Sequence, residues 1–160
     1  MTGKSSLDQA AAGLREIILA GEHYRQVVAD HLGLTISESQ AVSYLLSRGA
    51  MGQSELGEAL GFNTSSTTAL VDRLERNSIA ERIPHPTDRR RSTVQLSAAG
   101  RKTVGAATGW LVQAFDHVPP DTLAALAGTL HTLADDLRAR AAKVPARPRV
   151  VSRPAPRRRR

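Results

Sequence analysis

The stretch that decides the fold is QSELGEALGFNTSSTTALVDRLER, residues 53–76. Its apolar residues recur at three- and four-residue steps on both sides of Gly61, which predicts two short helices joined by a tight turn. Gly61 can take the left-handed backbone conformation that such a turn needs. The small residues Gly57 and Ala59 stand where the two helices would cross, so the pattern predicts a helix-turn-helix.

The two short helices are expected to span residues 53–60 and 64–77. Asn63 suits the start of the second helix, because its side chain can accept a hydrogen bond from a free backbone N–H group. Asn77 suits the end, where the chain often passes through a left-handed conformation. Four apolar side chains would hold the pair together: Leu56, Leu60, Phe62 and Leu70.

The hydrophobic period changes after the second short helix. The segments IAERI (79–83) and TVQL (93–96) alternate apolar and polar residues, which predicts two strands. Between them lies HPTDRRR (85–91), a charged, turn-rich segment with no apolar side chain apart from proline. The simplest interpretation is a two-stranded hairpin with an exposed basic tip.

Longer helical patterns flank this region on both sides. Residues 7–31 form one of them, and another begins at a capping box in SESQ (37–40) and stops at Gly49. After the hairpin, residues 98–117 return to a helical pattern. A last helix is expected over residues 119–141, where a leucine and alanine stripe continues for nearly three heptads.

The charge of the chain is concentrated at its C-terminal end. The 160 residues include 22 Lys and Arg against 15 Asp and Glu, a formal net charge of +7. Seven arginines and no acid lie in residues 145–160, so residues 1–144 are neutral. This tail is expected to be disordered. It could bind phosphates without sequence preference, have no function, or serve as a localisation signal in a nucleated cell.

Several classes of function are excluded by composition. The chain has no cysteine, which rules out disulfides, thiol catalysis, zinc–thiolate sites and thiol-based oxidant sensing. The 5 histidines show no paired metal spacing, and no acid pair or triad indicates an enzyme, a cofactor or a metal site. The apolar stretches are far shorter than the roughly 20 residues that cross a bilayer. Because MTGKSS (1–6) has no apolar signal core, we expect a soluble, cytoplasmic protein that does not enter a membrane.

Residues from about 34 to 104 resemble the MarR family of bacterial winged helix-turn-helix transcription regulators. The resemblance depends on LVDRLE (70–75), IAER (79–82), PTDRR (86–90) and VQLSAAG (94–100), of which the hairpin segment is the most specific. It implies a mainly α fold with a small β-hairpin wing and with dimerisation helices at the N- and C-terminal ends.

The resemblance divides the chain into four parts. It implies an N-terminal dimerisation helix (1–33), a winged helix-turn-helix DNA-binding domain (34–100), C-terminal dimerisation helices (101–144) and the tail (145–160). The last helices have little domain left to pack against, which also favours a dimer. The residues expected at the dimer interface are Leu14, Ile18, Leu123, Leu126, Leu130, Leu133 and Leu137.

The resemblance also assigns roles in DNA binding. Arg90 is similar to a wing-tip arginine that enters the minor groove, and Asp88 to the acid that holds this arginine in place. Arg73 matches an arginine close to the DNA backbone. The full set of residues expected to contact or support DNA is Gln53, Thr64, Ser65, Ser66, Thr68, Arg73, Asp88, Arg89, Arg90 and Arg91.

The function implied by the resemblance is that of a homodimeric, sequence-specific regulator of transcription. It would bind a pseudo-palindromic operator in double-stranded DNA and act as a repressor released by a small, aromatic or phenolic ligand. Four residues could line a ligand cleft or equally belong to the core, so no ligand site is assigned to them: His23, Tyr24, Tyr44 and Trp110.

One departure from the family supports an alternative. The second short helix carries Thr64 and Ala69 where family members often place arginine or another long side chain, and short side chains discriminate bases weakly. The alternative is a winged-helix interaction module or an architectural nucleic-acid binder without sequence preference. The sequence gives neither the operator, nor the regulated genes, nor the effector, nor the choice between repression and activation.

Deletion of residues 145–160 tests the arginine-rich tail. Removing 7 arginines should flatten the dependence of DNA affinity on salt, because fewer counterions are released on binding. The ranking of DNA sites should stay the same, which a fluorescence-anisotropy titration at several salt concentrations would measure. A changed ranking would mean that the tail takes part in reading sequence.

Overall fold

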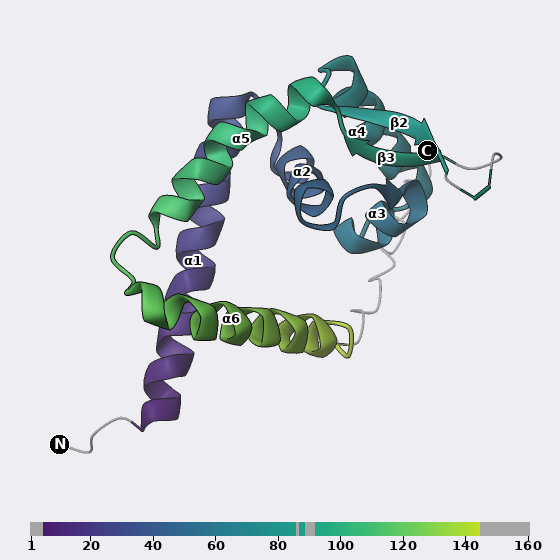
Figure 1. Cartoon of the computed structure of the whole chain (residues 1–160). Helices are drawn as coiled ribbons and strands as arrows, with labels where there is room; N and C mark the ends of the chain where they lie inside the picture. The colour runs from purple at the N-terminus through teal and green to yellow at the C-terminus, as the bar shows by residue number, and fades with distance from the viewer. Residues whose placement is uncertain (1–4, 86, 89–91, 145–160) are drawn as a thin grey trace, which may run out of the picture. The chain divides into compact units, whose positions relative to one another are not determined.

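The computed structural model describes residues 5–85, 87–88 and 92–144 (Figure 1). The chain divides into two compact units, Met1–Gln113 and Ala114–Arg160, which we treat separately. The elements in chain order are α1 (Ser6–Leu32), α2 (Ile36–Arg48), β1 (Met51–Gly52), α3 (Gln53–Leu60), α4 (Thr64–Arg76), β2 (Ala80–Pro84), β3 (Ser92–Leu96), α5 (Ala98–Gln113) and α6 (Pro120–Ala141).

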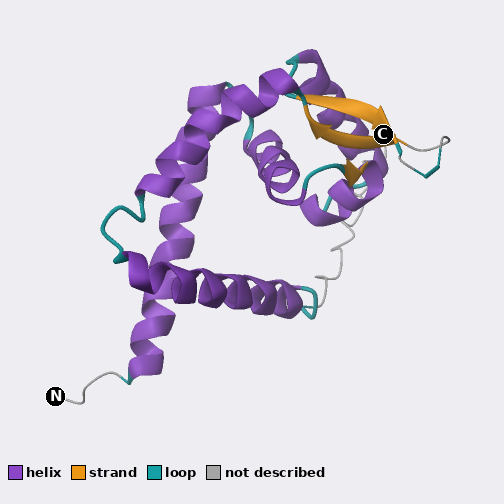
Figure 2. Cartoon of the chain, viewed as in Figure 1, coloured by secondary structure: helices purple, strands orange, loops and turns teal. Residues whose placement is uncertain are grey.

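The mainly helical architecture with a small antiparallel sheet confirms the expected fold class (Figure 2). Helices α3 and α4 form the helix-turn-helix, and strands β2 and β3 form the hairpin that follows it. Gly61 takes the left-handed conformation between the helices, with φ of 69°, as the turn requires. Asn63 caps α4 as predicted, because its side chain accepts a hydrogen bond from the Ser66 backbone N–H.

The sheet has three strands, whereas the sequence predicted two. Its order is β1-β3-β2, and both pairs are antiparallel, with Met51 opposite Val94 and Ile83 opposite Thr93. Strand β1 is only 2 residues long, which is too short to show an alternating pattern. The extra strand places Met51 in the core and ties the start of α3 to the middle of the hairpin.

A single apolar cluster joins the helix-turn-helix to the sheet. Leu56 of α3 and Leu70 and Leu74 of α4 have 0% of their surface exposed. They pack with α2, with the strands and with the start of α5. The other buried members of this cluster are Leu34, Ala41, Val42, Leu45, Met51, Val71, Ile79, Ala80, Val94, Leu96 and Val104.

The capping box predicted for residues 37–40 is wrong, because α2 begins earlier. Thr35 is the N-cap, and its hydroxyl accepts from the Glu38 backbone N–H at 3.3 Å. In return the Glu38 carboxylate accepts from the Thr35 backbone N–H at 2.9 Å. Threonine and glutamate three residues apart satisfy the same rule as the predicted pair, so the motif was assigned two residues too late.

The ends of two further helices differ from the prediction. Asn77 has a φ of −86°, and the left-handed residue after α4 is Ser78, with φ of 55°. The Ile79 N–H then reaches the Leu74 carbonyl, which closes the helix end. Helix α5 ends at Gln113 instead of residue 117, and the prolines at 119–120 disfavour a continued helix ahead of them.

Helix α5 packs along α1 within the first unit (Figure 1). The Tyr24 hydroxyl donates to the Ala107 carbonyl at 2.6 Å. The rings of His31 on α1 and Trp110 on α5 also meet edge to face, with centroids 5.1 Å apart. The second unit contains α6, none of whose residues is buried.

Gly100, in the first turn of α5, lies in close contact with the backbone of Ile79, which follows α4. A Cβ added to Gly100 would lie 1.9 Å from the Ile79 carbonyl oxygen and 2.7 Å from its carbon. The same carbonyl accepts from the Ser97 backbone N–H at 3.0 Å. Only glycine fits at this contact, because the neighbour is hydrogen-bonded backbone.

Gly100→Ala should destabilise the first unit by about 1–3 kcal/mol, because the backbone must move to admit the methyl group. The matched control is Gly105→Ala in the same helix, where an added Cβ meets nothing within 4 Å. That change should raise stability by about 0.5–1 kcal/mol through helix propensity. Urea denaturation followed by circular dichroism would measure both, and equal stability of the two variants would contradict the contact.

Candidate nucleic-acid interface

Helices α3 and α4 cross in close contact at Gly57, where any larger side chain would displace the Thr67 hydroxyl. Gly57 is buried, and a Cβ added there would lie 2.6 Å from the Thr67 hydroxyl oxygen. Thr67 is itself buried and its hydroxyl donates to the Asn63 carbonyl at 2.9 Å. This contact fixes the position of α4 and decides which of its side chains point outward.

The first two turns of α4 present a polar surface free of acids. Thr64, Ser65 and Ser66 are exposed, while Thr68 is half-buried. The first turn contains no acidic residue, so the partial positive charge of the helix N-terminus is not cancelled there. Such a surface suits an approach to phosphates and base edges. These four predicted contact residues therefore lie together on one helix.

The two flanks of α4 carry different partners. Thr64, Thr68 and Asp72 follow one another at four-residue steps and therefore share a flank, along which Thr68 meets α3 and Asp72 meets β2. Arg73 lies on the opposite flank, where it meets α2. The outermost strip between the flanks carries Ser65 and Ala69, which are exposed.

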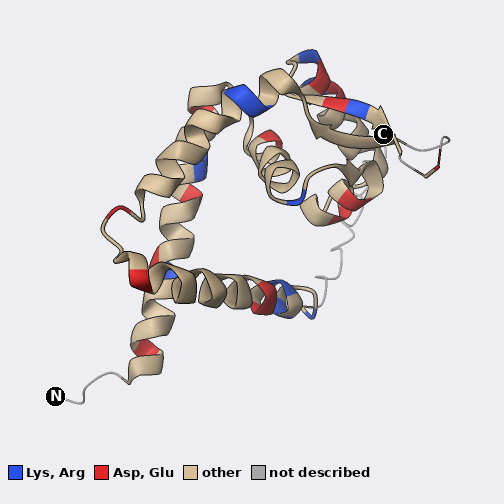
Figure 3. Ribbon diagram, in the orientation of Figure 1, with Lys and Arg blue, Asp and Glu red and all other residues tan. Residues whose placement is uncertain are grey.

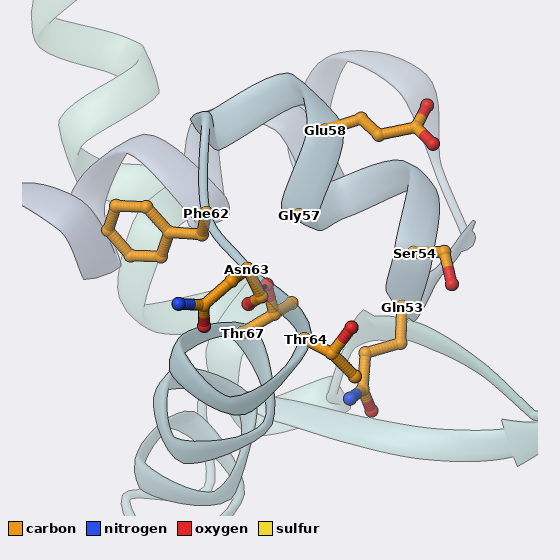
Figure 4. Close-up of a pocket in the computed structure, with 8 residues that line it drawn as sticks. All are labelled: Gln53, Ser54, Gly57, Glu58, Phe62, Asn63, Thr64 and Thr67. Atoms are coloured by element: carbon orange, nitrogen blue, oxygen red, sulfur yellow. Dashed lines mark hydrogen bonds between the residues drawn. The ribbon is translucent and has the colours of Figure 1, made fainter. Parts of the chain in front are cut away.

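Gln53, predicted to contact DNA, bridges α3 and α4. Its amide Nε2 donates to the Thr68 hydroxyl at 2.7 Å, and that hydroxyl donates to the Thr64 carbonyl at 2.9 Å. Figure 4 shows Gln53 and Thr64 approaching one another beside a hollow between the two helices, of about 370 Å³. The Thr68 hydroxyl already donates one bond and accepts one within the protein, so it can offer DNA only its remaining lone pair.

Arg82 of strand β2 connects the hairpin to α4. Its guanidinium forms an ion pair with Asp72 at 2.8 Å and another with Glu75, and its backbone N–H donates to Glu75 at 2.9 Å. The Arg82 guanidinium also donates to the side-chain amide oxygen (Oε1) of Gln53 at 3.4 Å. Figure 3 shows basic and acidic positions both on β2 and on the neighbouring helix α4, which carries the two acidic partners of Arg82. These contacts place β2 beside the flank of α4 that carries Thr68.

Arg73, predicted to lie near the DNA backbone, is paired with a buried acid. Its Nε donates to the Glu38 carboxylate at 2.7 Å, and the Glu38 side chain is only 5% exposed. Burial by itself would raise the pKa of Glu38. The Thr35 backbone N–H, the Arg73 guanidinium and the Thr35 hydroxyl outweigh burial and hold the pKa below its ordinary value of 4.5.

The predicted wing residues fall partly outside the described part of the chain. Arg89, Arg90 and Arg91 lie outside the described residues. Asp88 is described and half-buried. Strands β2 and β3, which lead into and out of this segment, are paired up to Pro84 and Ser92.

The sequence did not predict the roles of Glu38 and Arg82. Both residues lay within segments already recognised, one in a misplaced capping box and the other in IAER. The signal for Arg82 was present: two acids three residues apart on a helix, followed by an arginine at an inward-turning position of a strand. The Glu38 pair could not be assigned without knowing that α2 lies beside α4, nor the Arg82 pairs without knowing that β2 does.

A second hollow, of about 250 Å³, lies between α1, α2 and α5. It is lined by Gly21, Tyr24, Arg25, Val28, Ser39, Ser43 and Leu111. Of the four aromatic and histidine residues considered for a ligand cleft, only Tyr24 lines it. Tyr44 packs against the core under the Arg48 guanidinium, and Trp110 packs against His31.

Two features are absent from the described residues. No helix among them is long and apolar enough to pass through a bilayer. The same part of the chain holds no group of three or more histidine, aspartate or glutamate side chains arranged to bind a metal ion.

Comparison with known proteins relates this geometry to one family. Residues 34–92 match the model of the MarR family. The chain is 34% identical over 102 residues to the uncharacterised HTH-type transcriptional regulator YcgE of Bacillus subtilis strain 168. That match covers 63% of this chain and 66% of the relative, so the chain spans just under two thirds of the relative's length.

Two solved structures show the same fold at low identity. NadR in complex with 4-hydroxyphenylacetate has a TM-score of 0.60 and 19% identity, over 91% of this chain and 98% of that one. A mutant of S. aureus MepR bound to an oligodeoxyribonucleotide has a TM-score of 0.53 and 19% identity, over 80% of this chain and 97% of that one. The likeness extends beyond the segment 34–92 to most of the chain.

The Glu38–Arg73 pair predicts how stability depends on pH. Since the folded pKa of Glu38 lies below its ordinary value, the pair contributes fully above pH 4.5 and is lost as the pH falls through the folded pKa. Glu38→Gln should therefore lower the free energy of unfolding by about 1–3 kcal/mol at neutral pH, and by less in acid. The exposed residue Glu58 provides the control, Glu58→Gln. A gap between wild type and Glu38→Gln that stays constant from pH 7 to pH 3 would refute this role.

Proposed function

The chain belongs to the MarR family, and we propose on that basis that it is a homodimeric DNA-binding regulator of transcription. In this proposal α4 enters a major groove and the hairpin of β2 and β3 reaches the flanking minor groove. Repression of a neighbouring gene is the expected outcome. In this proposal residues 1–33 and 101–144 mediate dimerisation, and residues 34–100 bind DNA.

The observation that supports DNA binding best is the shared surface of α4 and the hairpin. The exposed start of α4 is polar and lacks acids, and Arg82 fastens β2 beside the same helix. A helix for one groove and a hairpin for the next must have a fixed spacing, and these ion pairs help to supply it. The S. aureus MepR mutant of similar fold was solved bound to an oligodeoxyribonucleotide.

Exposed apolar side chains support pairing of two copies. On α1, Ile17, Ile18 and Leu19 are 60%, 44% and 59% exposed. In the second unit, Leu133 and Leu137 of α6 are 38% and 41% exposed. Large exposed apolar side chains on the terminal helices are available to a protein–protein interface. Leu14, Leu123, Leu126 and Leu130 complete the proposed interface, and each is half-buried within its own unit.

A ligand could act through the hollow between α1, α2 and α5. NadR, of similar fold, was solved in complex with 4-hydroxyphenylacetate. In this chain the hollow is lined by Tyr24 and Arg25 of α1 together with serines of α2, which could receive a small phenol or carboxylate. Such a ligand would release DNA only if it prefers a conformation in which α4 is wrongly placed.

A titration with the chain's own upstream DNA tests the proposal. A specific regulator should bind that fragment about 10³-fold or more tighter than a scrambled duplex of equal length. Sedimentation at the same protein concentrations should give two copies per duplex. Equal affinity for both duplexes would favour the alternative, a nucleic-acid binder without sequence preference, which the serine- and threonine-rich surface of α4 keeps open.

Arg90→Ala tests the proposed wing contact in the same titration. Loss of a guanidinium from a narrow minor groove should weaken binding several-fold or more, by roughly 1 kcal/mol at the least. Dimerisation should be unchanged, as sedimentation would show. An unaltered affinity would remove Arg90 from the interface.

A further inference from the structure

Asp72 and Glu75 are acidic residues on the helix that would enter DNA. Asp72 is 51% exposed at its side chain, and Glu75 is 31% exposed. Asp72 follows Thr64 and Thr68 at four-residue steps, so it shares the flank that carries two of the proposed DNA contacts. Two carboxylates within about one Debye length, roughly 8 Å, of a bound phosphate backbone would repel it.

Arg82 is the basic residue that the described structure places between these two acids. One nitrogen of its guanidinium pairs with Asp72 at 2.8 Å, and another pairs with Glu75. Its side chain is 27% exposed, so the contacts are partly shielded from water and from salt. The backbone N–H of Arg82 donates to the same Glu75 carboxylate at 2.9 Å, which fixes the geometry from two directions.

The arginine is also connected to a proposed contact residue. Its guanidinium donates to the side-chain oxygen Oε1 of Gln53 at 3.4 Å, while Nε2 of the same amide donates to the Thr68 hydroxyl at 2.7 Å. The positive group therefore favours the orientation in which the Gln53 nitrogen faces α4. A continuous set of polar contacts runs from Thr68 through Gln53 and Arg82 to Asp72.

We propose that Arg82 is a positioning residue for DNA binding, which neutralises Asp72 and Glu75 and thereby allows the flank of α4 to approach phosphates. This inference rests on the proposed function in DNA binding. Arg82 acts through the acids and does not need to touch DNA itself. Because its positive charge is paired with two acids of the protein, Arg82 should add little to the number of counterions released on DNA binding.

Charge-changing variants test the inference on both the upstream fragment and a scrambled duplex. Arg82→Gln should weaken binding to either duplex about ten-fold at low salt, because it exposes two negative charges to the phosphates. The loss of affinity relative to wild type should become smaller as the salt concentration rises. Adding Asp72→Asn and Glu75→Gln to Arg82→Gln should restore affinity to within about two-fold of wild type, since the repulsion is gone.

Two further variants keep the result interpretable. Arg138→Gln removes the same charge from an ion pair with Asp135 in the second unit, and should leave affinity unchanged. The double variant Asp72→Asn with Glu75→Gln retains Arg82 and should bind as tightly as wild type or tighter. A thermal melt would show whether Arg82→Gln alone unfolds. In that event the double variant still tests whether the two acids oppose DNA binding.

The inference is overturned by any of three results: a deficit in Arg82→Gln that persists in the triple variant, one that is independent of salt, or weaker binding by the double variant. Those outcomes would mean that the arginine only holds the hairpin in place. Equal affinity of wild type for the two duplexes would defeat sequence-specific regulation instead. In that case the effects of the Arg82, Asp72 and Glu75 variants on affinity could still be measured with either duplex. Failure of the proposed function and failure of this inference are therefore distinguishable.

Discussion

The contact between Gly57 and Thr67 is the constraint on which the rest of the interface depends. It brings α3 so close to α4 that a Cβ at position 57 would displace the Thr67 hydroxyl, and Leu56 and Leu70 are buried in the core beside it. Once four positions of α4 are buried on one side, helical periodicity decides that Thr64, Ser65 and Ser66 face outward. The polar surface is therefore a consequence of packing as much as of composition.

Charge compensation is the second organising feature. Arg73 of α4 pairs with Glu38 of α2. On the opposite flank of α4, Asp72 and Glu75 pair with Arg82 of β2. These pairs act as braces between α4 and its two neighbours, α2 and β2. Both arginines are neutralised by ion pairs within the protein. The net charge of the chain therefore does not predict the electrostatic potential of this surface.

Much of the fold could be predicted from the sequence, because its signals are local. The turn at Gly61, the cap at Asn63 and the alternation of residues 79–83 each depend on a few neighbouring residues. Strand β1 could not be predicted, since two residues show no period and Met51 pairs with a strand more than 40 positions away. The ion pair of Glu38 was likewise missed because Arg73 is 35 positions away. The ion pairs of Arg82 were missed because they form only once β2 lies beside α4, whereas the exposure of Thr64 and Ser65 needed only the helical period.

The junction at Gly100 has a mechanical consequence. The Ser97 N–H and hydroxyl bond to the carbonyls of Ile79 and Ser78, and the Gly100 backbone lies flush against the first of these. The residues that directly follow α4 are therefore joined by backbone contacts to the first turn of α5. A change in the tilt of α5 would act on α4 through this junction.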